Sequence, residues 1–126
     1  MSHPSVQLTA TVLGTPDPGR LARFYAELLG WEIRAEEEDW VALRDPKGGA
    51  GLSFQAEQLH RRPVWPGNTV DQQMMMHLDF EVEDLQAASA HALSLGASLA
   101  EYQPQSDTLV HYDPAGHPFC LWVATR

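Results

Sequence analysis

The feature that most constrains the fold of this chain is an internal repeat of its turn signals. Leu29-Gly30 recurs as Leu95-Gly96, 66 residues later, and Asp45-Pro46-Lys47-Gly48 recurs as Asp113-Pro114-Ala115-Gly116, 68 residues later. Gly commonly ends a helix, and Asp-Pro-x-Gly has the residues of a tight turn. The same two signals in the same order indicate that the chain contains two copies of one helix-and-hairpin module.

Each copy has the residue pattern of a strand, a helix and three further strands. In the first copy the helix is expected at 20–29, with Asp17 as its N-cap, because apolar residues recur there at helical spacing. Alternation and β-branched residues predict the strands of this copy at 6–13, 31–35, 40–44 and 51–55. In the second copy the helix is expected at 85–95, and the strands at 74–82, 98–102, 109–112 and 118–123.

These elements predict one domain over residues 1–126. Module one covers about 5–56 and module two about 73–124. The intervening segment, about 57–72, contains two prolines, a glycine and an asparagine, and we interpret it as a linker that crosses the surface.

Composition excludes several partners. The 17 acidic residues outnumber the 8 Lys and Arg, for a formal charge of -9, so we expect neither nucleic acid nor an anionic membrane as a partner. The same charge weakly favours a cationic guest. Cys120 is the single cysteine, which prevents an intramolecular disulfide and suits a cytoplasmic location. We see no signal peptide at the N-terminus and no apolar run long enough to span a bilayer.

Three segments carry a family resemblance: 15–31, with its aromatic pair and Leu-Gly ending, 77–84 (HLDFEVED) and 113–121 (DPAGHPFCL). They resemble the vicinal oxygen chelate superfamily of glyoxalases, ring-cleaving dioxygenases and bleomycin-resistance proteins, and most of all its small glyoxalase-like members common in actinobacteria. The resemblance implies an α+β fold in which two βαβββ modules form an eight-strand curved sheet, or cup, with helices on the outer face. It also implies a ligand or metal on the concave face, and we expect a homodimer.

Enzymes of this superfamily hold a divalent metal with His, Gln or Glu side chains on the first and last strands of both modules. The resemblance places His77 at one of these positions, and the repeat offsets then give Thr11, or alternatively Ala10, as its counterpart. Cys120 and Leu52 fall at the last-strand positions. Only His77 is a standard family ligand, and a His with a Cys leaves a catalytic zinc one protein ligand short. We therefore expect no complete metal site and no cofactor, with His77 the ligand if a divalent metal binds.

The sequence instead predicts an apolar ligand pocket. Its expected lining is His77, Met75, Cys120 and Trp122, with Trp40 as a further candidate. Trp122 shares a strand face with Cys120, so it is the preferred stacking residue over Trp40 and Trp65. Alternative roles remain open: packing of the methionines and tryptophans in the core, a hydrogen-bonding wall at His77, and a buried apolar thiol at Cys120.

The other histidines are not expected to be ligands. His111 and His117 flank the second Asp-Pro turn and are predicted to be exposed, His91 is predicted on the outer face of a helix, and His3 and His60 fall in segments expected to be flexible.

Three functions are consistent with these residues. The first is a small-molecule-binding protein of the glyoxalase/bleomycin-resistance type without a complete family metal site. The second is a metal-dependent glyoxalase-like lyase, isomerase or dioxygenase that uses His77 as ligand or general base. The third is a structural or regulatory dimer with a closed cup.

Overall fold

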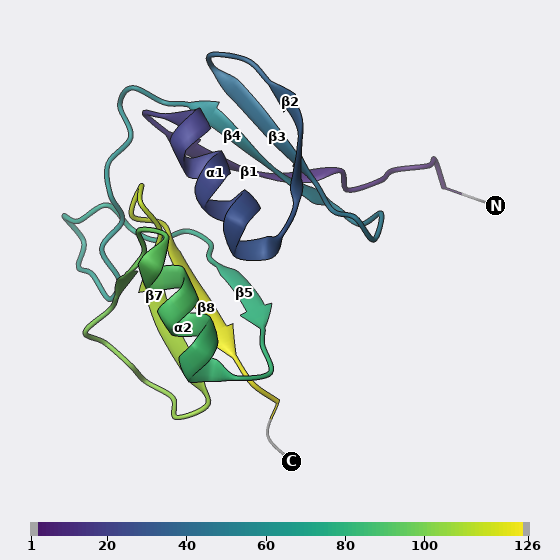
Figure 1. Cartoon of the computed structure of the whole chain (residues 1–126). Coiled ribbons are helices and arrows are strands. Elements are labelled where there is room, and N and C mark those ends of the chain that lie inside the picture. Colours follow the sequence, from purple (N-terminus) through teal and green to yellow (C-terminus); the bar gives the residue numbers. More distant parts are fainter. Residues whose placement is uncertain (1–2, 125–126) are drawn as a thin grey trace. The chain divides into compact units, whose positions relative to one another are not determined.

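The computed structural model describes residues 3–124 and divides into two compact units between Gln58 and Leu59. Each unit contains one βαβββ module, as Figure 1 shows. Within the described residues there are two helices and eight strands, and the strands are hydrogen-bonded as two mixed four-stranded sheets. The predicted α+β fold of two βαβββ modules is therefore confirmed.

The first module runs from a strand through a helix into a three-stranded meander. Its elements are β1 (Ala10–Thr15), α1 (Pro18–Leu29), β2 (Glu32–Glu36), β3 (Trp40–Arg44) and β4 (Gly51–Ala56). The order in the sheet is β1-β4-β3-β2, with β1 parallel to β4. Asp17 caps α1 by accepting a hydrogen bond from the Arg20 backbone N–H, as predicted, and Gly30 ends it with a φ of 70°.

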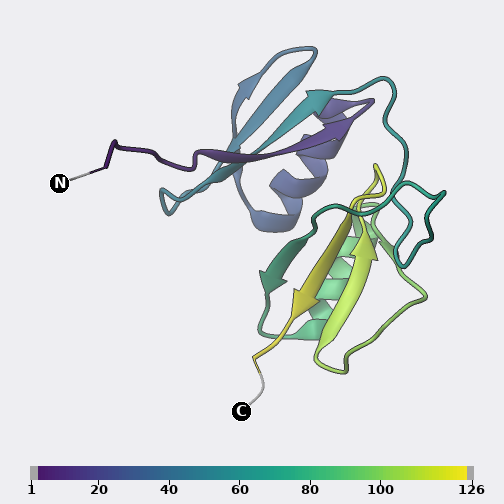
Figure 2. The same ribbon diagram turned by 180° about the vertical axis from the view of Figure 1, so that it is seen from behind.

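The second module repeats this arrangement. Its elements are β5 (Leu78–Glu81), α2 (Leu85–Ser94), β6 (Ser98–Leu99), β7 (Thr108–Tyr112) and β8 (Pro118–Trp122). The order is β5-β8-β7-β6, with β5 parallel to β8. Asp84 caps α2 as Asp17 caps α1. The sheet of this module covers one side of α2, which lies behind it in Figure 2.

The helix of each module packs on one face of its own sheet and forms the core there. In the first module Tyr25 of α1 stacks on Phe54 of β4, with ring centroids 5.7 Å apart. In the second, His111 of β7 hydrogen-bonds to Ser89 of α2 and stacks on Phe119 of β8. Because side chains alternate along a strand, Cys120 points to the opposite face of the second sheet. That face is the one on which a site can form.

Two predicted strands begin later than their sequence pattern suggests. The strand predicted at 6–13 starts only at Ala10, because its partner β4 begins at Gly51. The strand predicted at 74–82 starts only at Leu78, because β8 offers no partner before Pro118, which also lacks a backbone N–H. The prediction at 98–102 shortens to Ser98–Leu99. Alternation continued in these segments, but no neighbouring strand was there to pair with them.

Most of the segment interpreted as a linker, from Leu59 onward, belongs structurally to the second module. The Nε2 of His60 lies 2.8 Å from the carbonyl oxygen of Ala115, and Arg62 donates to the carbonyl oxygen of Pro114 at 3.0 Å. The ring of His60 also lies 5.0 Å from that of His117. The segment is therefore tied to the β7–β8 hairpin, and the expectation that His60 lies in a flexible stretch is wrong.

Candidate functional site

The candidate site lies on the face of the second sheet opposite α2. β5 and β8 run side by side there, and Asp79 pairs in register with Cys120. Cys120 is 5% exposed and packs with Ala100 and Val110, with Trp65 and Tyr112 against this cluster. The sheet thus provides a buried thiol next to an exposed carboxylate.

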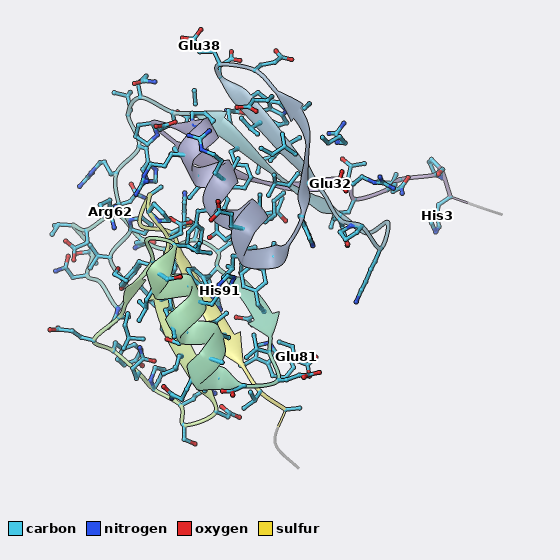
Figure 3. All side chains as sticks on the ribbon, in the orientation of Figure 1. His3, Glu32, Glu38, Arg62, Glu81 and His91 are labelled. Atoms are coloured by element: carbon cyan, nitrogen blue, oxygen red, sulfur yellow. The ribbon has the colours of Figure 1, made fainter. Side chains whose placement is uncertain are left out.

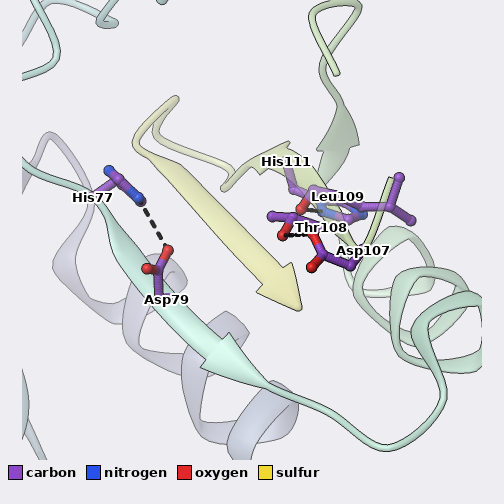
Figure 4. Close-up of polar contacts among 6 residues, drawn as sticks. All are labelled: His77, Asp79, Asp107, Thr108, Leu109 and His111. Atoms are coloured by element: carbon purple, nitrogen blue, oxygen red, sulfur yellow. Dashed lines mark hydrogen bonds and ion pairs between the residues drawn. The ribbon is translucent and has the colours of Figure 1, made fainter. Parts of the chain in front are cut away.

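Three donor groups of different chemistry converge at this point. The Nε2 of His77 lies 3.0 Å from the Oδ1 of Asp79, a contact drawn in Figure 4. The nitrogen, oxygen and sulfur donors of His77, Asp79 and Cys120 all lie within 4.8 Å of one another. The side chains of His77 and Asp79 are 30% and 60% exposed, so the cluster is open to solvent on one side and closed by the sheet on the other.

The electrostatics of the cluster favour a neutral thiol. Burial, the negative charge of Asp79 and the hydrogen bond between Asp79 and the thiol together raise the pKa of Cys120 to about 11, with burial the largest cause. Cys120 is therefore protonated at neutral pH and donates its S–H to the Asp79 carboxylate. A thiol in this state is a poor nucleophile.

Trp65 connects this cluster to an open groove. Its ring stacks on that of His77, with centroids 5.2 Å apart, and its carbonyl oxygen accepts a hydrogen bond of 2.8 Å from the Tyr112 hydroxyl. The ring of Tyr102 lies edge-on to that of Trp65, with centroids 6.4 Å apart. The groove has a volume of about 660 Å³ and is lined by Trp65, Pro66, Ser98, Leu99, Ala100, Glu101, Tyr102 and Tyr112.

The structure brings together only part of the predicted lining. His77 and Cys120 meet at the donor cluster. Trp122 is partly buried on the Cys120 side of β8, in register with Glu81. Met75 precedes β5 and is 77% exposed, so it does not pack in the core. Trp40 lies in the first module, partly buried on β3.

Asp79 and Trp65 are the residues that sequence reasoning undervalued. Alternation alone does not place Asp79 beside His77, because residues two apart on one strand face are ~6–7 Å apart at the backbone. Side chains from such positions can nonetheless lean together, and here His77 and Asp79 touch. The His-x-Asp spacing was the available signal. Trp65 gave no comparable signal, because its segment has no regular structure to indicate a direction.

The other histidines divide between confirmed and wrong predictions. His91 projects from α2 and is exposed, as expected (Figure 3). His111, predicted to be exposed, is instead fully buried: its Nε2 contacts the Ser89 hydroxyl at 2.8 Å and its Nδ1 the Leu109 carbonyl at 3.2 Å. Burial lowers the pKa of His111 below its ordinary value of 6.5. It is a core residue because it is on the β7 face that packs on α2.

The first module has no matching donors at the corresponding positions. Phe54 faces α1, so Leu52, two residues earlier on β4, faces the helix as well, and Ser53 is the counterpart of Cys120. The mapping of Cys120 onto Leu52 is therefore wrong by one residue. In the same register Ala10, the alternative named from the sequence, is the counterpart of His77. An alanine cannot bind a metal, and a buried serine is not among the common ligands of such sites.

The chain belongs to the glyoxalase-like domain family. The model of this family matches residues 10–122, which span both modules. This membership places the chain in the vicinal oxygen chelate superfamily, as its three sequence segments indicated. No curated protein matches the chain.

Solved structures with the same fold come from several bacteria. A glyoxalase/bleomycin resistance protein/dioxygenase family enzyme from Burkholderia phytofirmans PsJN is 18% identical, with a TM-score of 0.73 over 95% of this chain and 100% of that one. A glyoxalase-related enzyme from Fulvimarina pelagi is 20% identical, with a TM-score of 0.68 over 94% and 88%. A glyoxalase/bleomycin resistance protein from Albidiferax ferrireducens T118 is 18% identical, with a TM-score of 0.62 over 93% and 98%. At these identities the likeness establishes the fold alone.

Helices α1 and α2, which are 12 and 10 residues long, are too short to cross a bilayer, and none in the described part of the chain qualifies as a membrane span.

Proposed function

We propose that this protein binds a small organic molecule in the groove of its second module, without the complete metal site of its superfamily. The observation that carries the proposal is the groove of about 660 Å³ with Trp65, Tyr102 and Tyr112 in its lining. Small-molecule sites typically have a few hundred to a thousand cubic ångströms and aromatic walls. Two tyrosines and a tryptophan provide flat surfaces against which a planar guest can stack.

Charge favours a cationic guest. Glu101 lines the groove and is exposed, and the chain as a whole carries a formal charge of -9. A cation held over an aromatic face gains about 0.5–2 kcal/mol, depending on how far it is desolvated. The proposed ligand is therefore planar, aromatic and positively charged.

Titration with proflavine, a planar aromatic cation, tests this proposal against acridine, a neutral analogue at mildly alkaline pH. We expect proflavine to bind more tightly and Tyr102→Ala to weaken it by about fivefold or more, since one aromatic contact contributes ~1 kcal/mol. Tyr102 is 46% exposed, so its loss leaves the fold intact. Glu101→Gln is expected to reduce the preference for proflavine, whereas the matched control Glu81→Gln, on β5 outside the groove, is expected to leave it unchanged. Equal binding of both dyes by all variants would refute the proposal.

A metal-dependent lyase or dioxygenase that uses His77 is the second candidate. The convergence of three donors at His77, Asp79 and Cys120 favours it. The two candidates differ in what purified protein contains, because only the second needs a bound ion. Elemental analysis tests the second candidate: a near-stoichiometric metal that is lost in His77→Ala supports the enzyme, and protein that contains no metal counts against it.

We also predict where the protein is located and how it assembles. A single cysteine and an acidic chain are consistent with the reducing cytoplasm. We expect a homodimer, because modules of this superfamily pair within one chain or across two. Sedimentation equilibrium measures the mass directly, and a monomer would count against exchange of modules between two chains.

A further inference from the structure

The donor cluster formed by His77, Asp79 and Cys120 brings together three different kinds of metal-binding atom. It combines an imidazole nitrogen, a carboxylate oxygen and a sulfur, all within 4.8 Å of one another. All three residues belong to the second module, so the set is complete within one sheet, on the adjacent strands β5 and β8. Asp79 is on β5, His77 directly precedes that strand, and Cys120 comes from the centre of β8.

This donor set suits one class of ion. Zinc binds nitrogen, oxygen and sulfur ligands, and its catalytic sites use three protein ligands with a fourth position left open. Zinc–ligand bonds of about 2.0–2.3 Å place neighbouring ligand atoms roughly 3.3–3.6 Å apart. The imidazole and carboxylate are 3.0 Å apart, and no two donor atoms are more than 4.8 Å apart, which is at most about 1.2–1.5 Å beyond the ideal. Two of the three side chains are exposed and can adjust by that amount.

We propose that His77, Asp79 and Cys120 bind a zinc-type divalent cation in a three-ligand site within the second module, with its fourth position open to solvent. The site differs from the metal set of the superfamily, which draws ligands from both modules, because Asp79 replaces the donors missing at Ala10 and Ser53. Binding breaks the S–H bond of Cys120 and forms a sulfur–metal bond, and the proton leaves to solvent. Trp65, stacked on His77, holds the imidazole plane and borders the groove.

The proposal deepens the second candidate function and is independent of the groove. A metal could bind at the cluster whether or not a planar cation binds beside Trp65. The proflavine titration tests the groove through Tyr102 and Glu101, neither of which belongs to the donor cluster. Failure of one experiment therefore leaves the other unaffected.

Cobalt substitution provides the test. The full chain, without a polyhistidine tag, is freed of metal with a chelator and titrated with Co²⁺. We expect near-ultraviolet cobalt–thiolate charge-transfer absorption together with the visible bands of tetrahedral cobalt, saturating at one equivalent and abolished by Zn²⁺. Because Cys120 is the single cysteine, any thiolate band must come from it.

Variants of each donor identify the ligand set. Cys120→Ser is expected to lose the charge-transfer band while keeping a hydroxyl that can donate to Asp79. Asp79→Asn and His77→Gln are each expected to weaken Co²⁺ binding by tenfold or more, since even outer-sphere changes at metal sites cost about 10–100-fold. Far-ultraviolet circular dichroism checks that each variant is folded.

Matched controls come from the same module. Glu81→Gln changes a carboxylate two residues beyond Asp79 on β5, and His91→Gln changes an exposed histidine on α2; both are expected to bind Co²⁺ as the wild type does. Glu81 lies at the far end of β5 in Figure 3. The proposal is overturned if no thiolate band appears, if the band survives in Cys120→Ser, or if Asp79→Asn and His77→Gln bind with unchanged affinity.

Discussion

Loss of the Ser89 hydroxyl is predicted to destabilise the second module, because that hydroxyl satisfies a buried imidazole. His111 is 0% exposed, and its Nε2 lies 2.8 Å from the Ser89 Oγ. The Nδ1 contacts the carbonyl oxygen of Leu109, which can only accept, so Nδ1 carries the proton and Nε2 accepts from Ser89. Ser89→Ala therefore leaves a buried acceptor unsatisfied, at a cost of about 1–3 kcal/mol in the free energy of unfolding.

A double-mutant cycle separates this hydrogen bond from packing. In the wild type the rings of His111 and Phe119 stack with centroids 5.2 Å apart. His111→Phe retains a ring that can stack in this way and removes the nitrogen that needs a hydrogen-bond partner. The hydroxyl of Ser89 then loses its acceptor in the single variant, whereas the double variant leaves neither group unpaired. We expect the double variant to lose less free energy of unfolding than the two single variants lose together, by about 1 kcal/mol.

Urea unfolding followed by circular dichroism measures these free energies. Ser94→Ala is the matched control, because Ser94 lies on the same helix but is exposed, with its hydroxyl bonded to the His91 carbonyl. Its expected effect is below about 0.5 kcal/mol. A loss no larger for Ser89→Ala than for this control, or strictly additive effects in the cycle, would refute the assignment of His111 as a buried, hydrogen-bonded core residue.

Three further predictions concern pH and backbone geometry. The pKa of His111 is lowered on folding, so its contribution to stability is fully present above the ordinary value of 6.5 and is lost as pH falls. The free energy of unfolding, measured as a function of pH, should show this loss in the wild type and not in His111→Phe. The rate at which a thiol reagent modifies Cys120 should keep rising with pH through the ordinary thiol pKa of 9.0 toward about 11, and a plateau near 9.0 in the wild type would contradict this. Asp79→Asn should lower the pH at which the rate is half-maximal, but not to 9.0, because burial is the larger cause of the raised pKa. Gly116→Ala should lower the free energy of unfolding by at least about 1 kcal/mol, since φ is +91° there and a Cβ would lie 2.9 Å from the Arg62 side chain. A variant that unfolds at the same temperature as the wild type would contradict this prediction.

The modular fold was predictable because its signals are local. Glycine after a helix and Asp-Pro-x-Gly between strands act within a few residues, and both copies of each signal fall where the structure has helix ends and hairpins. The limits of β1 and β5 were not predictable in the same way. Each strand ends where its partner across the sheet ends, and the partner is more than thirty residues away in sequence.

The candidate site was only partly predictable for a related reason. His77 and Cys120 were found from their strand positions, but the contact between His77 and Asp79 depends on side-chain rotamers that alternation does not specify. Trp65 lies in a segment whose path is set by hydrogen bonds to the β7–β8 hairpin, and nothing local in its sequence indicates that destination. His111 was misjudged because a polar residue beside a turn is usually exposed.

The central claim, a small-molecule site in the groove of the second module, is tested most directly by nuclear magnetic resonance. The chain has four tryptophans, and their indole N–H signals can be assigned individually in a ¹H–¹⁵N spectrum. Titration with proflavine is predicted to shift the Trp65 indole and the amides of Tyr102 and Tyr112, which line the groove, and to leave the Trp40 indole of the first module unchanged. Saturating shifts at Trp40 or Trp122 with none at Trp65 would contradict the account.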